Sequence, residues 1–203
     1  MKFPDMIINL LNVIRRKGLV ETCLLCLNSL LGVVITKVKI FWLRIRGYDI
    51  DFSVSLRGDN TFFQSTKNSI KIGKRSVIGP NVKLSSGFGG LIVVKNRVGI
   101  FDYTIIDIHS RLEIGENTLI SPFCYITDYD HVLRDKDMPI IKQGYKTSPI
   151  KIGKNVWLGA KVIVLKGITI GDNTVIGAGS VVTKNIPSDC VAAGNPARIM
   201  KKI

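Results

Sequence analysis

The stretch "IKIGKNVWLGAKVIVLKGITIGDNTVIGAGSVV", residues 150–182, places an aliphatic side chain at every sixth position. Glycine follows the aliphatic residue in most of these units, at Gly153, Gly159, Gly171 and Gly177. A period of six matches neither the 3.6-residue turn of an α-helix nor the two-residue alternation of a strand. It suits a short strand followed by a tight corner that glycine eases, with three such units closing one coil of a solenoid.

The same period continues toward the N-terminus as far as Ile72. The earlier aliphatic positions are Ile72, Ile78, Leu84, Val94, Ile100, Ile106, Ile114, Ile120 and Ile126. The pattern predicts an all-β solenoid, a parallel β-helix of about five coils between residues 70 and 187. With the usual strand spacing of ~4.8 Å, this makes a prism about 24 Å tall.

The repeat is interrupted in two places, at "SSGFGGL" (85–91) and at residues 127–151. The second interruption inserts a long segment, polar and charged in its first half, between two consecutive coils. A packed solenoid interior cannot hold such an insertion, so we expect a surface loop of the kind that carries binding and catalytic groups. One of the two histidines of the chain, His131, lies in this loop.

Charge is distributed unevenly along the 203 residues, whose formal net charge is +14. Residues 1–47 carry 8 basic and 2 acidic side chains, residues 48–141 carry 11 of each, and residues 142–203 carry 10 basic and 2 acidic ones. Two basic ends around a neutral middle indicate two anionic partners, or one basic arm and one basic pocket. The sequence has no helix-turn-helix, RNP or zinc-finger pattern, so we expect no nucleic-acid partner.

The four cysteines are Cys23, Cys26, Cys124 and Cys190. The C-x-x-C pair at 23 and 26 has no second pair to complete a zinc site and lies in an apolar run, which favours buried thiols. The sequence therefore predicts no metal and a reducing, cytoplasmic compartment.

Residues 1–47 form a separate N-terminal segment that precedes the β-helix domain, residues 48–203. The apolar run "CLLCLNSLLGVVI" (23–35) is short for a membrane span. In "TKVKIFWLRIR" (36–46), lysine and arginine alternate with aromatic and aliphatic residues, as in an interfacial membrane segment. The segment therefore either caps the open end of the β-helix as one or two helices, or binds peripherally to the inner face of the membrane.

The segment "IKIGKNVWLGAKVIVLKGITIGDNTVIGAGSVVTKNIPSDCVAAGNPARIMKKI" (150–203) resembles the C-terminal part of the hexapeptide-repeat acyltransferases. The resemblance covers residues 70–203 and is strongest to the branch of galactoside, maltose and polysaccharide O-acetyltransferases. It implies a left-handed β-helix, a homotrimer, an active site in each cleft between neighbouring prisms, and acetyl-CoA as co-substrate.

The resemblance also implies catalytic residues. His131, in "ITDYDH", takes the place of the catalytic histidine of this branch. Neutral imidazole has an ordinary pKa of about 6.5 and suits the removal of a proton from a sugar hydroxyl. The backbone N–H of Ala160, in "WLGA", is the expected donor to the thioester oxygen and to the oxyanion that forms from it. Asp128, Asp130 and a backbone carbonyl remain alternatives for the group that orients His131.

Donor and acceptor residues follow from the same resemblance. In "GAGSVVTKNIP" and "NPARI", Ala178 is expected to bind the pantetheine amides through its backbone, and Thr183, Lys184 and Arg198 to bind the nucleotide phosphates. His109 occupies an acceptor position at which the better-known sugar acetyltransferases carry an acidic residue. The remaining expected acceptor contacts are Asp102, Asp128 and Tyr129.

The function expected is O-acetylation of a sugar hydroxyl in surface polysaccharide biosynthesis, of a capsule or an O-antigen. One alternative is N-acetylation of a nucleotide-linked amino sugar, and another is a non-catalytic structural β-helix. A serine acetyltransferase would need a large N-terminal helical domain. A β-helical carbonic anhydrase needs three histidines for its metal, and the chain has two.

Overall fold

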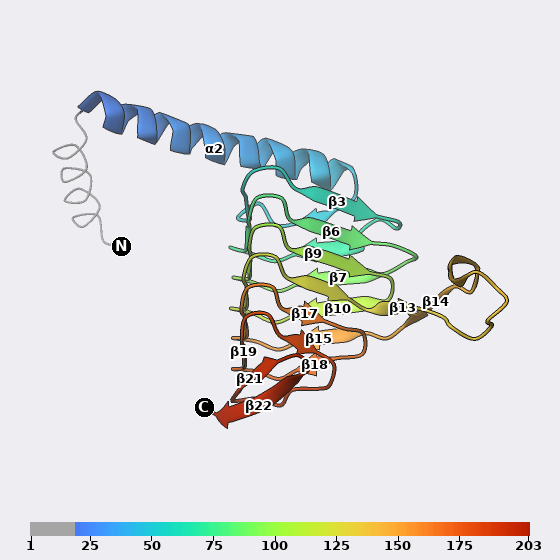
Figure 1. Ribbon diagram of the computed structural model, residues 1–203. Helices are drawn as coiled ribbons and strands as arrows, with labels where there is room; N and C mark the ends of the chain where they lie inside the picture. The colour runs from blue at the N-terminus through green and yellow to red at the C-terminus, as the bar shows by residue number, and fades with distance from the viewer. Residues whose placement is uncertain (1–18) are drawn as a thin grey trace. The chain divides into compact units, whose positions relative to one another are not determined.

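The computed structural model describes residues 19–203, in which eighteen short strands wind into a parallel β-helix of six stacked coils with three sheets (Figure 1). Sheet A contains β1 (Asp49–Ile50), β4 (Ile70–Ile72), β7 (Leu91–Val94), β10 (Arg111–Ile114), β15 (Ile150–Ile152) and β18 (Thr169–Ile170). Sheet B contains β2 (Ser55–Leu56), β5 (Val77–Ile78), β8 (Gly99–Ile100), β11 (Leu119–Ile120), β16 (Trp157–Leu158) and β19 (Val175–Ile176). Sheet C contains β3 (Thr61–Gln64), β6 (Lys83–Ser86), β9 (Ile105–Ile108), β12 (Tyr125–Thr127), β17 (Ile163–Val164) and β20 (Val181–Val182).

The predicted solenoid is confirmed, but it has six coils instead of about five. The additional coil is the first, β1 to β3. Its inward side chains Ile50, Leu56 and Phe62 keep the spacing of six, with Ile50 fully buried and Leu56 5% exposed. Asp51, Arg57 and Phe63 follow them where later coils often have glycine, so the sequence pattern does not reveal this coil.

Packing inside the prism follows the repeat. Aliphatic side chains of successive coils stack in register, as in the pairing of Ile114 with Ile152 and of Ile120 with Leu158, and all four are essentially inaccessible to solvent. Gly115 shows why glycine follows the aliphatic residue, because a Cβ there would lie 2.5 Å from the Gly153 carbonyl carbon of the next coil. The close approach of the backbones therefore requires the missing side chain.

The second interruption of the repeat forms an antiparallel hairpin that projects from the prism (Figure 1). Its strands are β13 (Tyr129–His131) and β14 (Tyr145–Thr147), with a short 3-10 helix, η1 (Ile140–Lys142), between them. After coil six, β21 (Cys190–Gly194) extends sheet B, and β22 (Ala197–Lys202) pairs with it antiparallel.

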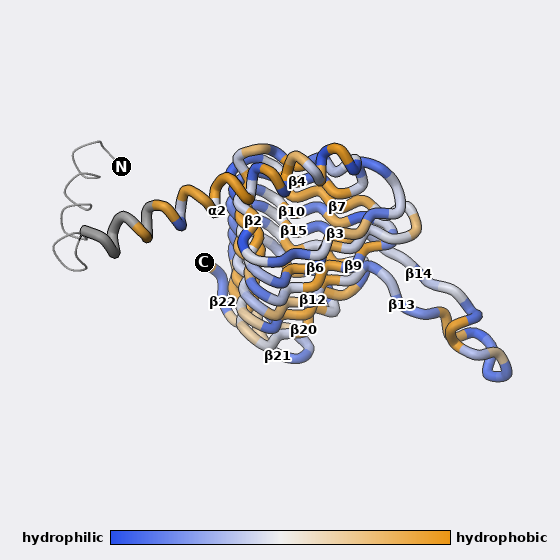
Figure 2. The backbone as a smooth tube through the Cα atoms, turned by 90° about the horizontal axis from the view of Figure 1, so that it is seen from above, coloured by the Kyte–Doolittle hydropathy of each residue, from blue (hydrophilic) through white to orange (hydrophobic). Residues whose placement is uncertain are grey.

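The N-terminal helix α2 spans Leu19–Ile45 and is mostly hydrophobic (Figure 2). The chain divides into compact units after Lys39, and not after residue 47, because the end of α2 belongs to the β-helix unit. Ile40 is fully buried in the core, and the Arg44 guanidinium donates a 2.8 Å hydrogen bond to the Ile50 carbonyl. No helix within residues 19–203 has both the length and the hydropathy that spanning a bilayer requires. The side chains of Cys23 and Cys26 lie outside the described residues.

Candidate active site

One corner of the prism has the same geometry in coils two to six. This sheet B–C corner is the four-residue turn from a strand of sheet B to one of sheet C, at residues 79–82, 101–104, 121–124, 159–162 and 177–180. The second residue of the turn is proline in two coils, and in the others it is Asp102, Ala160 or Ala178. The backbone N–H of those three residues has no hydrogen-bond partner within the described chain. The two alanine amides are thus available to a bound molecule.

The other corner that carries candidate residues varies from coil to coil. This sheet C–A corner joins sheet C to sheet A, and in coils two to six it comprises residues 87–90, 109–110, 128–149, 165–168 and 183–185. It therefore holds both interruptions of the repeat. Of the predicted site residues, it contains His109, Asp128, Tyr129, His131, Thr183 and Lys184.

His131 is the last residue of β13 and is exposed. Tyr145 pairs with it across the hairpin, and the two ring centroids are 4.7 Å apart. The His131 ring makes no hydrogen bond to any residue from 19 to 203. Its neighbour Asp130 forms an ion pair with Lys166 of the next coil instead, so Asp130 holds the hairpin to the prism and does not orient the imidazole.

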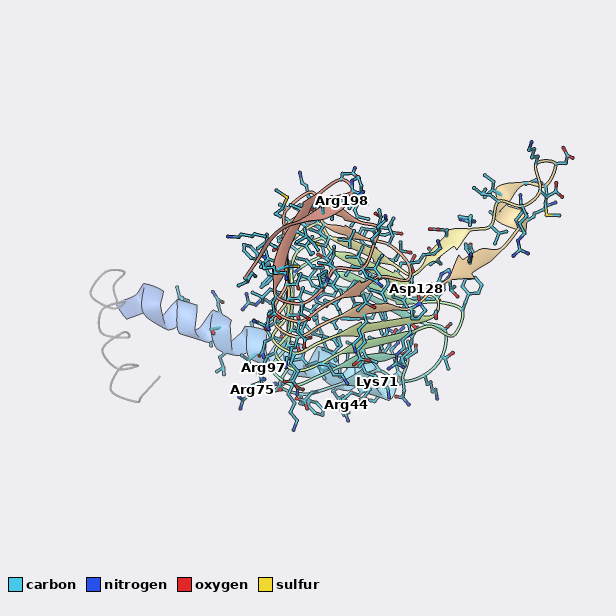
Figure 3. All side chains as sticks on the ribbon, turned by 90° about the horizontal axis from the view of Figure 1, so that it is seen from below. Arg44, Lys71, Arg75, Arg97, Asp128 and Arg198 are labelled. Atoms are coloured by element: carbon cyan, nitrogen blue, oxygen red, sulfur yellow. The ribbon has the colours of Figure 1, made fainter. Side chains whose placement is uncertain are left out.

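Asp128 has a different place from the one expected. Its carboxylate is fully buried at the root of the hairpin (Figure 3), where Oδ1 accepts the His109 N–H at 2.8 Å and Oδ2 accepts the Ser110 and Arg111 N–H groups at 2.7 and 2.8 Å. Ser148, where the hairpin returns, donates its N–H to the Asp128 carbonyl at 2.8 Å. Both carboxylate oxygens are occupied by the backbone, which contradicts the expected acceptor contact and removes Asp128 as a partner of the His131 ring.

Aromatic rings from three consecutive coils stack along the sheet C–A corner. The His109 ring lies 3.7 Å from the Tyr129 ring, nearly parallel to it, and 4.6 Å from the Phe88 ring. Tyr145 contacts all three, with centroid distances of 5.1 Å to His109, 5.2 Å to Tyr129 and 5.5 Å to Phe88. Since Tyr145 also contacts His131, it connects the two histidines of the chain.

Tyr129 is less free to bind an acceptor than expected, because its hydroxyl donates a 2.9 Å hydrogen bond to Asp107 Oδ2. Burial, reinforced by the Asp107 carboxylate, raises the pKa of Tyr129 well above its usual value, so the phenol stays protonated. The Nδ1 atom of His109 is buried without a hydrogen-bond partner in the described chain. His109 therefore retains an unused polar group beside the hairpin.

Phe88, Asp107 and Tyr145 were not predicted from the sequence. Phe88 lies in the first interruption, which gave no chemical signal of its own. Tyr145 could be found only from the register of the hairpin, and the period of six ends where the hairpin begins. The one sequence signal was an aromatic residue shortly before the coil resumes at Ile150.

The expected donor residues fall on both corners. Arg198 is exposed on β22 and pairs with Ala193, whose side chain lies beside Gly177 at the start of the sheet B–C corner of coil six. Figure 3 shows Arg198 well separated from Asp128. Thr183 and Lys184 are exposed on the sheet C–A corner.

Within one chain the candidate residues thus form two groups. Asp102, Ala160, Ala178 and Arg198 lie at or near the sheet B–C corner, whereas the histidines, Tyr129, Thr183 and Lys184 lie on the sheet C–A corner. Sheet C separates the two groups. A single chain therefore does not bring His131 and the Ala160 amide to one point.

Cys124 is a core residue. It is 1% exposed, and its Sγ donates to the Gly159 carbonyl at 3.3 Å. Burial raises its pKa to about 11, so the thiol is not a nucleophile at neutral pH. In residues 19–203, no three His, Cys, Asp or Glu side chains are grouped to hold a metal ion.

Comparison with known proteins agrees with this architecture. The family described as "Bacterial transferase hexapeptide (six repeats)" matches residues 149–184. Galactoside O-acetyltransferase of Escherichia coli (strain K12) is 40% identical over 133 residues, which are 65% of this chain and 63% of the relative, so the chain spans less than two thirds of that protein.

Two further relatives are covered more fully. WbbJ of Escherichia coli (strain K12), whose name refers to O-acetyl transfer in lipopolysaccharide biosynthesis, is 36% identical over 141 residues, 66% of this chain and 72% of WbbJ. The crystal structure of a maltose O-acetyltransferase from Clostridium difficile 630 is 39% identical, with a TM-score of 0.59 over 65% of this chain and 68% of that one. The chain belongs to the hexapeptide-repeat, left-handed β-helix acyltransferase family, in the branch of the galactoside, maltose and O-antigen O-acetyltransferases.

Proposed function

We propose that this protein transfers an acetyl group from acetyl-CoA to a sugar hydroxyl in the synthesis of a surface polysaccharide, a capsule or an O-antigen. The observation that carries the proposal is the exposed His131 on a hairpin at one corner, together with an unpaired Ala160 amide at the other. The relatives at 36 to 40% identity are named as O-acetyltransferases of galactosides, maltose and lipopolysaccharide, which supports the choice of an oxygen acceptor.

The chemistry assigned to these residues is base-assisted acyl transfer. A hydroxyl is a poor nucleophile at neutral pH, so the His131 imidazole removes its proton as the oxygen bonds to the acetyl carbon. The Ala160 N–H donates a hydrogen bond to the oxyanion that develops on the acetyl oxygen. When the carbon–sulfur bond breaks, protonated His131 returns the proton to the departing thiolate. No cysteine or metal takes part in this scheme.

The separation of His131 from Ala160 supports a homotrimer in which the sheet C–A corner of one chain faces the sheet B–C corner of its neighbour. A surface for self-association is available on and beside sheet B. Leu119 and Trp157 on its outer face, and Tyr103 and Phe123 on the sheet B–C corner, are each about half exposed. Burial of such side chains between copies is favourable, as for other apolar surface.

The residues present fit the acetyl-CoA that the family implies. Unpaired alanine amides suit the thioester oxygen and the pantetheine carbonyls. Exposed Lys184 and Arg198 suit phosphates, since arginine binds them in a bidentate manner and lysine as a point charge. Thr183 adds a hydroxyl at the same corner as Lys184.

The test is to incubate the purified protein with acetyl-CoA and a panel of glycans, methyl glycosides and nucleotide-linked amino sugars, and to measure mass gain. We expect one acetyl group on a neutral glycan, and mild alkali should remove it because it is an ester. An alkali-stable product on an amino sugar would establish the N-acetyltransferase alternative instead. If a folded, trimeric protein acetylates none of the acceptors, the proposed function is wrong and the alternative of a non-catalytic structural β-helix is favoured.

We also propose a cytoplasmic location at the inner face of the membrane. Cys124 and Cys190 are free thiols, in agreement with a reducing compartment.

The membrane location is supported by exposed side chains near the start of the β-helix unit. Phe41, Trp42, Ile45 and Phe52 are exposed there. Arg44 lies over the Phe52 ring at 5.0 Å, and a groove of about 270 Å³ beside it is lined by Arg44, Lys71, Lys74 and Lys95 together with Asp49 and Asp51. Exposed aromatic side chains together with basic ones favour anionic lipid headgroups.

Vesicle binding tests this location. Replacing Lys37, Lys39 and Arg46 by glutamine should weaken sedimentation with phosphatidylglycerol vesicles, while Arg44 is kept because it donates to the Ile50 carbonyl. The matched control replaces Lys151, Lys161 and Lys201, which are exposed on the β-helix. Equal weakening in both variants would mean that only net charge matters, and no binding by the parent protein at low salt would contradict the membrane location.

A further inference from the structure

The first interruption of the repeat, residues 85–91, has no part in the chemistry proposed above, yet it lies on the sheet C–A corner with the hairpin. Figure 1 shows the connection from β6 to β7 and the β13–β14 hairpin on the same edge of the prism. The Phe88 ring is 4.6 Å from the His109 ring and 5.5 Å from the Tyr145 ring. The two interruptions therefore meet in space through aromatic side chains.

Phe88 is 75% exposed, more than any other Phe, Tyr or Trp in the described chain. It also adopts a left-handed backbone conformation, with a φ of 50°, which is uncommon for a bulky residue. Neither burial nor backbone preference accounts for phenylalanine at this position, so we infer that its exposed ring has a role in binding. Exposed aromatic surface beside a reactive group is typical of a binding site.

The connection that carries Phe88 is held in place by hydrogen bonds. Gly87 donates its N–H to the Ile108 carbonyl at 2.9 Å, Gly90 to the Gly87 carbonyl at 2.8 Å, and Gly89 to Ser65 Oγ at 2.9 Å. A Cβ on Gly87 would lie 3.1 Å from His109 Cδ2, so glycine there lets the connection lie against the His109 ring. Phe88 is thus presented in a fixed position on the aromatic stack.

The distance to His131 suits a single substrate. Both the Phe88 and His131 rings contact Tyr145, at 5.5 and 4.7 Å, so their centroids are at most about 10 Å apart. A sugar whose hydroxyl reaches His131 extends about this far. The face of an aromatic ring is electron-rich and attracts positively polarised hydrogens, and the C–H bonds on one face of a pyranose supply them.

We propose that the exposed face of Phe88 is a stacking subsite for a pyranose ring of the acceptor, so that the enzyme prefers a closed sugar ring to an open-chain polyol. This inference rests on the proposed O-acetyltransferase function and adds a specificity-determining residue to it. An open-chain polyol has the same hydroxyls but no rigid apolar face, and it gains nothing from the stack. The acetyl donor does not enter this subsite.

The experiment compares two probes, the methyl glycopyranoside with the largest mass gain in the panel and the corresponding hexitol. The parent protein should acetylate the pyranoside with the higher kcat/KM. Phe88→Ala should raise the KM for the pyranoside about 5- to 10-fold, the size expected of one aromatic stack. The same variant should leave kcat, the KM for acetyl-CoA and the kinetics with the hexitol nearly unchanged. Phe88→Trp should restore the preference for the ring.

The matched control is Phe63→Ala, because Phe63 is an exposed phenylalanine on sheet C, 53% accessible, outside the aromatic stack. An unchanged KM for the pyranoside in Phe88→Ala would overturn the subsite. Equal damage by Phe88→Ala and Phe88→Trp, or a parallel loss with the hexitol, would also overturn it, because Phe88 would then only support the hairpin. If the parent protein acetylates no glycan at all, the proposed function fails first and this inference fails with it.

Discussion

The two corners that carry the candidate site differ in the groups available to a ligand, which are backbone amides at one corner and side chains at the other. At the sheet B–C corner every coil turns in four residues, and the groups it leaves unpaired for a ligand are backbone amides, those of Ala160 and Ala178. At the sheet C–A corner the connections differ in length, and what they present is side chains, from Phe88 to His131. Backbone amides recognise groups common to all acyl-CoA molecules, whereas side chains can select one acceptor among many.

In the proposed function, this difference places the thioester and pantetheine arm of the donor at the regular corner and the acceptor at the irregular one, where Thr183 and Lys184 also reach the donor phosphates. A thioester and its pantetheine arm can be bound by any chain that keeps the coil geometry, so the regular corner need not vary with substrate. The acceptor requires a base and a surface that fits one sugar, and both lie on the sheet C–A corner, where the repeat is interrupted. Apart from Thr183 and Lys184, substitutions on the irregular corner should therefore change the kinetic parameters of the acceptor, and substitutions at the regular corner those of the donor.

The largest effect is expected at His131. Because its ring is exposed and makes no hydrogen bond within residues 19–203, His131→Ala should leave the melting temperature unchanged. It should lower kcat about 10²- to 10⁴-fold, as loss of a general base does. The measurement is steady-state kinetics with the best glycan of the panel, with thermal melting of each variant alongside.

His109→Ala is the companion variant, and it should act mainly on the KM for the acceptor, because His109 lies in the aromatic stack and not on the hairpin. Abolished turnover in His109→Ala with intact turnover in His131→Ala would reverse the two roles.

A smaller loss is expected for Asp128→Asn. The carboxylate fixes the root of the hairpin through three backbone N–H groups, and an amide nitrogen in place of one oxygen faces a donor instead of accepting it. A hydrogen bond to a charged group contributes about 1.5–3 kcal/mol. We therefore expect kcat to fall about 10- to 100-fold while the KM for acetyl-CoA changes little.

Hydrogen exchange separates this positioning role from general destabilisation. In Asp128→Asn, the amides of β13 and β14 should exchange faster, and those of the sheet B–C corner should not. Asp135→Asn is the matched control, because Asp135 is an exposed carboxylate at the far end of the hairpin. Faster exchange throughout the coils would mean that Asp128 stabilises the whole fold and not the position of His131.

The regular coils and their four-residue turns could be predicted from the sequence, whereas the contacts on the irregular sheet C–A corner could not. The period of six identified the inward residues Ile72 to Val182, because burial and register are repeated in every coil. It missed the coil at residues 49–64, whose inward side chains lack the following glycine. Ala160 and Ala178 could be located by the resemblance, since their surroundings are those of a regular turn.

Side-chain contacts on the irregular corner could not be derived in this way. Asp128 has the composition of an exposed loop carboxylate, and only the three-dimensional path of residues 109–111 shows that it is buried. Tyr145 meets His131 through a hairpin register that no repeat specifies. The contact of Phe88 with that hairpin joins the connections of two coils that are not adjacent, and sequence spacing gives no sign of it.

The smallest effect is expected for the charges that would bind the donor phosphates. Lys184 and Arg198 are exposed, so each contributes through solvent over no more than a Debye length of about 8 Å. Lys184→Gln and Arg198→Gln should each raise the KM for acetyl-CoA about 3- to 10-fold, less than for a buried charged hydrogen bond because both side chains are exposed. S-acetylpantetheine keeps the thioester and the arm but lacks every nucleotide phosphate, so its kinetics should be nearly the same in both variants and in the parent protein.

The matched control is Lys151→Gln, which removes an exposed charge from sheet A and should change the KM of neither donor. Equal losses with both donors would mean that Lys184 and Arg198 hold the last coil or the trimer together, and the donor would then be bound by the backbone of the regular corner alone.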